Sequence, residues 1–80
     1  IMADRFPLIL NTSANQIQEI ASGDNLDMTG NNIKSVSQVI FAGMTTTARN
    51  NITASAGMVI YNSTTNKLQC YNGSSWNDLF

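Results

Sequence analysis

Residues 57–76 read GMVIYNSTTNKLQCYNGSSW, in which short apolar runs alternate with turn-forming residues. Asparagine readily adopts left-handed backbone angles and hydrogen-bonds to its own main chain, so Asn62–Asn66 is predicted to reverse the chain. The Asn72-Gly73 pair is typical of a tight hairpin turn. The pattern therefore predicts a three-stranded meander with strands at Gly57–Asn62, Lys67–Tyr71 and Trp76–Leu79.

The alternation of side chains along these strands predicts their two faces. Leu68 and Cys70 are expected on a dry face of the second strand, and Lys67, Gln69 and Tyr71 on a wet face. The first strand is apolar on both faces. We therefore expect it to lie in the centre of a sheet or to press against a partner chain.

The same pattern occurs earlier in the chain. Residues 8–20 align without gaps on residues 59–71, and each copy has an apolar run, an Asn, three small residues and a second Asn. The repeat predicts a second hairpin near the N-terminus. The main alternative is a helix at Ser13–Ala21, because Ser13 followed by Gln16 resembles a capping box.

The middle of the chain has weaker signals. Leu26–Thr29 alternates as a strand would, Gly30–Asn32 is typical of a turn, and Ile33–Phe41 is a broken β-branched run. Gly43–Asn51, which contains three consecutive threonines, is predicted to be a loop. Taken together, these patterns predict an all-β protein of short β-hairpins with a C-terminal three-stranded meander.

Composition excludes several functions. The chain has no histidine and only Cys70 as a cysteine, so it forms no internal disulfide, Cys/His zinc site or imidazole-based triad. Asp24 and Asp27 lack the further oxygen ligands and distal Glu of a calcium loop, and we interpret them as solvated turn carboxylates. We expect a non-enzymatic protein without cofactor or metal.

Charge and hydropathy exclude other partners. Four Lys and Arg against five Asp and Glu give a net charge of −1, so no basic patch points to nucleic acid. No apolar run approaches the roughly 18 residues needed to span a bilayer, and no membrane partner is expected. A glycan is an open alternative, because Tyr61, Tyr71 and Trp76 beside amides could stack against a sugar, although core packing or a subunit contact would also explain them.

A chain of 80 residues needs additional stabilisation. Below about 80 residues a lone core rarely supplies more than roughly 3–5 kcal/mol, and small domains usually add disulfides, a metal or self-association. The first two are not available here. Association with copies of itself or with a larger assembly is therefore predicted, and a marginally stable monomer is the alternative.

Two stretches resemble phage structural proteins. Residues 57–76 fit the pattern G-x-x-x-Y-N-x-x-T-N-K-x-x-x-Y-x-G-x-x-W, which is similar to the ending common in phage tail fibres and related virion proteins. Residues 2–10, 16–20 and 23–33 resemble the amino-terminal module of structural proteins of marine cyanobacterial phages. The resemblance implies a virion component, often an intertwined homotrimer, whose end docks on other virion proteins of the capsid or tail.

The resemblance also assigns roles to three parts of the chain: residues 1–22 as an attachment arm or hairpin, residues 23–56 as a central β/loop segment, and residues 57–80 as the meander. Only a short segment separates the two matching stretches, which favours a short fibre or a capsid decoration protein over a full adhesin. Exposed N-terminal apolar residues would add a strand to an edge on the particle, with an ordinary core strand as the alternative. The docking candidates are Phe6, Pro7, Leu8 and Leu10, and the trimer-interface candidates are Leu26, Met28, Ile33, Val36 and Val39.

Overall fold

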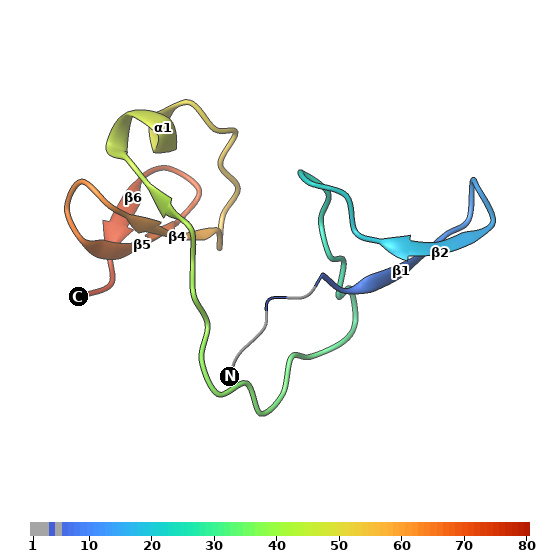
Figure 1. Ribbon diagram of the computed structural model, residues 1–80. Coiled ribbons are helices and arrows are strands. Elements are labelled where there is room, and N and C mark those ends of the chain that lie inside the picture. Colours follow the sequence, from blue (N-terminus) through green and yellow to red (C-terminus); the bar gives the residue numbers. More distant parts are fainter. Residues whose placement is uncertain (1–3, 5) are drawn as a thin grey trace. The chain divides into compact units, whose positions relative to one another are not determined.

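The computed structural model describes Asp4 and residues 6–80, which form two compact units, one ending at Ser35 and one spanning Val36–Phe80. We call them the N-terminal and C-terminal units. Figure 1 shows that the N-terminal unit contains one hairpin and that the C-terminal unit contains a small sheet with one helix. The all-β fold expected from the sequence is confirmed, since six strands are accompanied only by one five-residue helix in the described part of the chain.

The N-terminal hairpin joins β1 (Leu8–Asn11) to β2 (Gln16–Glu19) in antiparallel register, with Leu10 opposite Ile17. Oδ1 of Asn11 accepts hydrogen bonds from the amides two and three residues further on, those of Ser13 and Ala14, each at 3.1 Å. Asn15 closes the turn at a φ of 58°, a left-handed angle that asparagine tolerates. The hairpin prediction is confirmed, and the alternative helix is not formed.

No regular element lies between β2 and Gly43, and all residues from Ile20 to Ala42 are described. The prediction of a strand at Leu26–Thr29 is wrong. Asp27 accepts a hydrogen bond from the Thr29 amide at 2.8 Å, and the Asn31 amide donates to the Met28 carbonyl at 2.7 Å. These bonds close a turn, and an alternating segment without a ladder partner does not become a strand.

The sheet of the C-terminal unit consists of β3 (Gly43–Met44), β4 (Val59–Asn62), β5 (Lys67–Tyr71) and β6 (Trp76–Asp78). The strands lie in this order, with β3 parallel to β4 and the other neighbours antiparallel. The meander is therefore confirmed, and its first strand is central, as expected. Lys67–Tyr71 is a strand along its predicted length, whereas the first and third strands of the meander are shorter than predicted.

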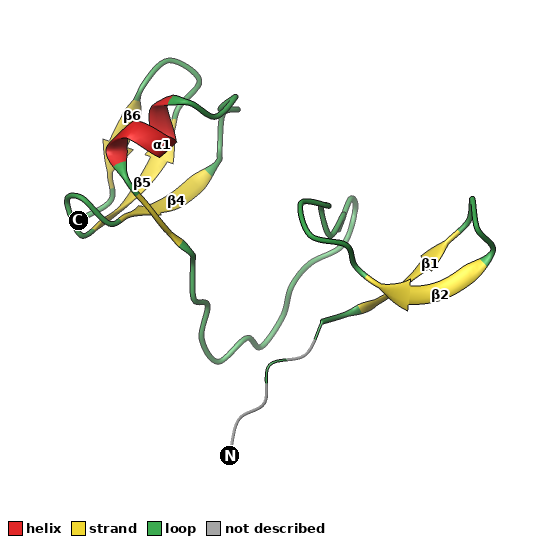
Figure 2. Cartoon of the chain, turned by 45° about the horizontal axis from the view of Figure 1, so that its top comes forward, coloured by secondary structure: helices red, strands yellow, loops and turns green. Residues whose placement is uncertain are grey.

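A short helix follows β3 where a loop was predicted. α1 spans Thr46–Asn50 and lies beside the sheet in Figure 2. Thr45 is its N-cap, and the Thr45 hydroxyl accepts a hydrogen bond from the Ala48 amide at 3.1 Å. The threonine tract thus supplies a capping residue, which is one of the residue types that start helices.

The repeat seen in the sequence is also a repeat of structure. In the β4–β5 turn, Asn62 Oδ1 accepts hydrogen bonds from the Thr64 and Thr65 amides at 2.9 and 3.3 Å, as Asn11 does in the first hairpin. Asn66 has a φ of 58°, the value found at the equivalent Asn15. Each asparagine pair therefore fixes one hairpin of the same design.

Candidate functional site

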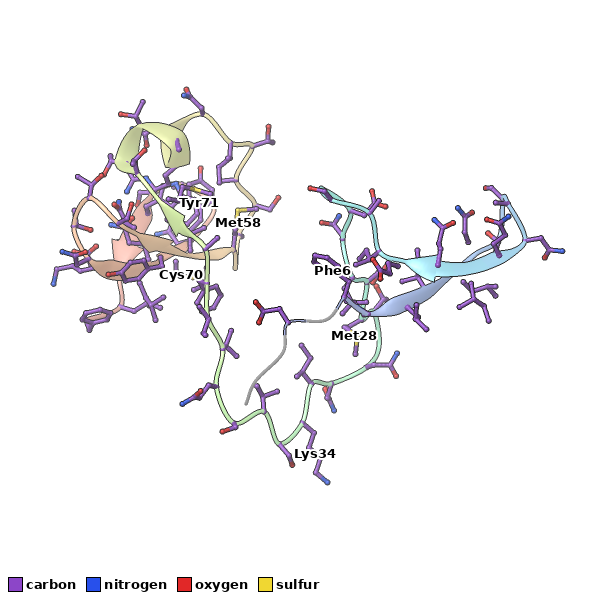
Figure 3. The ribbon with its side chains drawn as sticks, in the orientation of Figure 1. Phe6, Met28, Lys34, Met58, Cys70 and Tyr71 are labelled. Atoms are coloured by element: carbon purple, nitrogen blue, oxygen red, sulfur yellow. The ribbon has the colours of Figure 1, made fainter. Side chains whose placement is uncertain are left out.

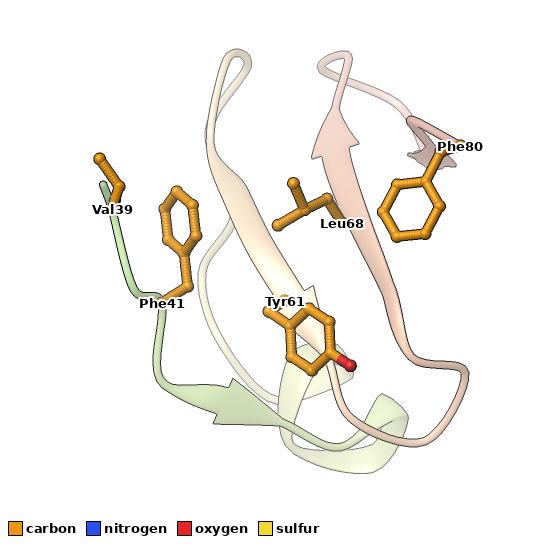
Figure 4. Close-up of a pocket in the computed structure, with 5 residues that line it drawn as sticks. All are labelled: Val39, Phe41, Tyr61, Leu68 and Phe80. Carbon is orange, nitrogen blue, oxygen red and sulfur yellow. The ribbon is translucent and has the colours of Figure 1, made fainter. Parts of the chain in front are cut away.

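One face of the C-terminal sheet carries an open apolar groove of about 410 Å³ (Figure 4). Tyr61 on β4 and Leu68 on β5 lie directly opposite each other in the antiparallel register, so their side chains share this face. The segment before β3 adds one wall and the chain end after β6 adds the other. The groove is lined by Val39, Phe41, Tyr61, Leu68 and Phe80.

The side chains that line this groove are incompletely covered. Val39 is 65% exposed, Phe41 42% and Phe80 66%. Phe80 is held at the rim, because the Lys67 ammonium donates to its carbonyl at 2.8 Å and lies 5.4 Å from its ring centre. A set of large exposed apolar residues on one face makes this groove a candidate surface for contact with another molecule.

The polar face of the same sheet is the buried one. Asn62 is fully buried and Gln69 is 6% exposed, whereas Ile60 is the single buried hydrophobic side chain among the described residues. Alternation along β5 was predicted correctly, but the assignment of Gln69 to a wet face is wrong. Its amide is buried because other polar side chains satisfy it, which removes the usual cost of burial.

A polar network of five side chains joins α1 to this face. Nδ2 of Asn62 donates to the Thr46 hydroxyl and to Gln69 Oε1, both at 3.0 Å. The Arg49 guanidinium donates to Gln69 Oε1 at 2.9 Å, and Gln69 Nε2 donates to an Asp78 carboxylate oxygen at 2.7 Å. No buried side-chain nitrogen or oxygen lacks a partner in the described part of the chain. The network therefore attaches α1 to the sheet.

The three aromatic residues considered for glycan stacking do not lie on one face. Tyr71 and Trp76 are paired across β5 and β6, with ring centres 5.2 Å apart and planes tilted by 55°. The Arg49 guanidinium lies 5.8 Å from the Trp76 ring centre. Tyr61 lies on the groove face and donates its hydroxyl to Asn66 Oδ1 at 3.1 Å. A platform made of all three rings is therefore not formed.

Cys70 is the only cysteine, and it follows Leu68 on the groove side of β5. It is half-buried and carries a free thiol, whose nearest hydrogen-bonding contact is the Tyr71 carbonyl at 3.8 Å (Figure 3). It lies beside the groove without lining it.

The predicted interface residues are mostly exposed. Val39 lines the groove, and Val36 begins the same unit. Leu26, Met28 and Ile33 lie on an irregular segment of the chain, on which Figure 3 labels Met28 and Lys34. Met28 is half-buried, and the exposed fractions of the rest are 56% for Leu26, 71% for Ile33, 48% for Val36 and 65% for Val39. Exposure fits an interface, and these assignments stay predictions.

The docking candidates are exposed as well. Pro7 is exposed, and the exposed fractions are 71% for Phe6, 69% for Leu8 and 65% for Leu10. The β1–β2 register places Leu8 and Leu10 on the same face as Ile17, which is 73% exposed. Sequence reasoning missed Ile17, although its position opposite Leu10 follows from the predicted turn.

Sequence reasoning also missed three groove residues, Phe41, Leu68 and Phe80, as parts of a functional surface. Leu68 was assigned to a dry face, and Phe41 to a β-branched run without a partner. The signal that could have found Leu68 is the cross-strand pair that the Asn62–Asn66 turn imposes on Tyr61 and Leu68. Phe80 carries no such signal, because it follows the last strand.

The described residues hold little that suggests chemistry. They contain no group of three or more Cys, Asp or Glu side chains that could hold a metal ion. No helix among them is both long and apolar enough to cross a membrane. The pKa of Asp27 lies below its ordinary value because the Thr29 hydroxyl, and then the Thr29 amide, donates to its carboxylate. The hydrogen bonds of this carboxylate therefore stabilise the turn at Asp27–Thr29.

A comparison with protein families gives one match. The family model described as "Phage tail like trimerisation region" matches residues 11–80, which include β2, α1, the C-terminal sheet and the groove, but only the last residue of β1. No curated protein and no solved structure matches the chain significantly.

Proposed function

Since the chain belongs to the family of phage tail-like trimerisation regions, we propose that it is a structural protein of a phage tail fibre that holds three copies together. The observation that carries this proposal is the apolar groove of the C-terminal unit. The groove is formed mainly by exposed aliphatic and aromatic side chains and lies opposite the buried polar network. Apolar surface of this kind supports association between copies of one chain.

The groove offers enough apolar surface to matter. Burying a whole Val or Phe side chain contributes about 1.5–3 kcal/mol, so the exposed parts of Val39, Phe41 and Phe80 are worth about 4 kcal/mol in each copy. That is comparable with the roughly 3–5 kcal/mol that a lone core of this size supplies. Sharing these side chains would therefore add a stabilisation similar in size to that of the lone core.

The proposed role is non-enzymatic and requires no cofactor. Positioning three chains needs complementary surfaces, and the residues of the groove carry no catalytic group. We further propose that the protein is part of the virion. A short tail fibre is favoured over a capsid decoration or cement protein because the matching family is tail-like.

Docking on the particle is assigned to the N-terminal hairpin. A two-stranded hairpin is marginal alone in water, and each of its strands has an open edge. Leu8, Leu10 and Ile17 form an apolar stripe along one face, where they are 65–73% exposed. The occupant we propose is another virion protein of the tail, which also accords with the resemblance of residues 2–33 to particle-attached modules.

The trimer is tested by sedimentation equilibrium at micromolar concentration. The wild-type chain is expected to sediment at three times its 8.7 kDa mass, and Phe41→Ser to sediment as a monomer. Phe6→Ser is the matched control, because Phe6 is more exposed than Phe41 but lies in the other unit. Trp76 fluorescence checks that each variant is folded. A monomeric wild-type chain, or equal assembly of both variants, would contradict the proposal.

Docking is tested separately with the double variant Leu8→Ser and Leu10→Ser. It is expected to stay trimeric and to lose binding to particles that lack the protein. Binding that equals the wild type would remove the docking role. If the trimer instead unfolds, the first strand belongs to a core.

A further inference from the structure

Ile40 is the most exposed large apolar side chain among the described residues, at 90%. It lies between Val39 and Phe41, which both line the apolar groove, whereas Ile40 does not. The segment runs extended into β3 (Figure 2), and successive side chains of an extended chain point to opposite sides. Ile40 therefore projects away from the groove of its own chain.

We infer that Ile40 inserts into the apolar groove of a neighbouring copy and that three such insertions close the trimer. This inference rests on the proposed function and specifies its interface. Ile40 lies between two residues of the groove wall, Val39 and Phe41, so an insertion at Ile40 would bring the neighbouring copy against the same segment. The partner is a second copy of this chain because the matching family is defined by trimerisation.

Size and polarity agree with this occupant. A cavity of about 150 Å³ lined by aliphatic and aromatic residues accepts a benzene ring, whereas the groove measures about 410 Å³. A four-carbon isoleucine side chain therefore fits with room for flanking atoms. The neighbours Gln38 and Ala42 are uncharged, and no charged side chain lines the groove itself. The Lys67 ammonium lies at the rim beside Phe80, so insertion takes no charged group into the groove.

A ring of copies is compatible with this geometry. Ile40 and the groove face different ways, so the contact joins two different surfaces and each copy uses both. Contacts of this head-to-tail kind form rings when the rotation between copies closes. In a three-membered ring no Ile40 and no groove is left unused.

The first test compares Ile40→Ser with Ile17→Ser by sedimentation over a concentration series. Ile17 is the matched control, because it is an isoleucine 73% exposed in the N-terminal unit. Ile40→Ser is expected to raise the concentration of half-assembly about a hundredfold, as three buried isoleucines are lost per trimer. Ile17→Ser is expected to keep the wild-type value, and Ile40→Val to keep most of the assembly.

The second test locates Ile40 in the trimer by cross-linking. In a Cys70→Ala background, a tagged Ile40→Cys chain is mixed with a Phe80→Cys chain and oxidised. A disulfide between the two kinds of chain is expected, because position 40 of one copy would reach the groove wall of the next. Cross-links only between Ile40→Cys chains would overturn the inference, since the isoleucines would then meet on the axis.

The outcomes separate this inference from the proposed function. If Ile40→Ser assembles like the wild type while Phe41→Ser does not, insertion is wrong and the trimer stands. If Ile40→Ser stays trimeric but no longer binds particles, another virion protein covers Ile40 and the inference is overturned. A wild-type chain that is monomeric throughout would remove the proposed function itself.

Discussion

Replacing Asn62 with Ala removes the centre of the polar network. Asn62 is fully buried. Its Oδ1 accepts from the Thr64 and Thr65 amides, and its Nδ2 donates to Thr46 Oγ1 and Gln69 Oε1, at distances of 2.9–3.3 Å. The substitution removes all four hydrogen bonds and leaves their partners in place.

The expected loss follows from the fate of these partners. The Thr64 and Thr65 amides belong to exposed residues and reach water, whereas the half-buried Thr46 hydroxyl and the buried Gln69 amide lose part of their hydrogen bonding. At about 0.5–1.5 kcal/mol for each bond, the free energy of unfolding should fall by about 3 kcal/mol. Gln69 Oε1 keeps its bond from Arg49, which limits the loss.

Asn11→Ala is the matched control that the repeat provides. Asn11 occupies the same position in the first hairpin and accepts from two turn amides, at the surface of the other unit. The unfolding of each variant is followed in urea by the fluorescence of Trp76, the single tryptophan, at one fixed protein concentration.

With a slope of about 1 kcal/mol per molar urea, the midpoint for Asn62→Ala should fall by about 3 M. The control should leave the Trp76 transition nearly unchanged. If Asn62→Ala shifts the midpoint no more than Asn11→Ala does, the amides do not hold the C-terminal unit together.

Three further predictions concern single residues. The pKa of Asp27 should lie below its ordinary value of 3.8, so the stabilising effect of its ionised form is present above that value and disappears as the pH falls through the lower folded pKa. Titration followed by NMR of the carboxyl carbon should show this, and Thr29→Val should raise the pH of the titration midpoint. Gly73→Ala should lower the free energy of unfolding by about 1–2 kcal/mol, because Gly73 has a φ of 101°, and an unchanged melting temperature would contradict this. Arg49→Lys should make Trp76 more accessible to acrylamide, since a planar guanidinium 5.8 Å from the ring centre is lost; equal quenching would show that Arg49 does not cover the ring.

Much of the fold could be predicted because the turns are local. Asn11, Asn62 and Asn72 each accept hydrogen bonds from the two amides that lie two and three residues further on. This arrangement depends on the asparagine and a few following residues, so a short window of sequence contains it. Both hairpins and the meander were predicted from it correctly.

The middle of the chain could not be predicted in the same way. Whether Leu26–Thr29 becomes a strand depends on a neighbour in space, and no window of sequence supplies one. The pairing of Gly43–Met44 with β4 joins segments far apart in the chain. Thr45 is the N-cap of the helix that follows, but it is one of three consecutive threonines, and the sequence does not indicate which of them caps a helix.

The candidate site was only partly predictable for a different reason. Alternation fixes which residues share a face, but not which face is covered. Gln69 was assigned to water by its polarity, yet Asn62, Arg49 and Asp78 satisfy its amide in the interior. Leu68, on the other face, lines an open groove.

The placement of amides inside and hydrocarbon on the open face gives the molecule two separate responses to temperature. Attraction between apolar surfaces weakens on cooling, because its driving force near 25 °C is almost entirely entropic. The interior of each chain, centred on Asn62, depends far less on that force. Chilling should therefore release single folded chains, and rewarming should bring them together again.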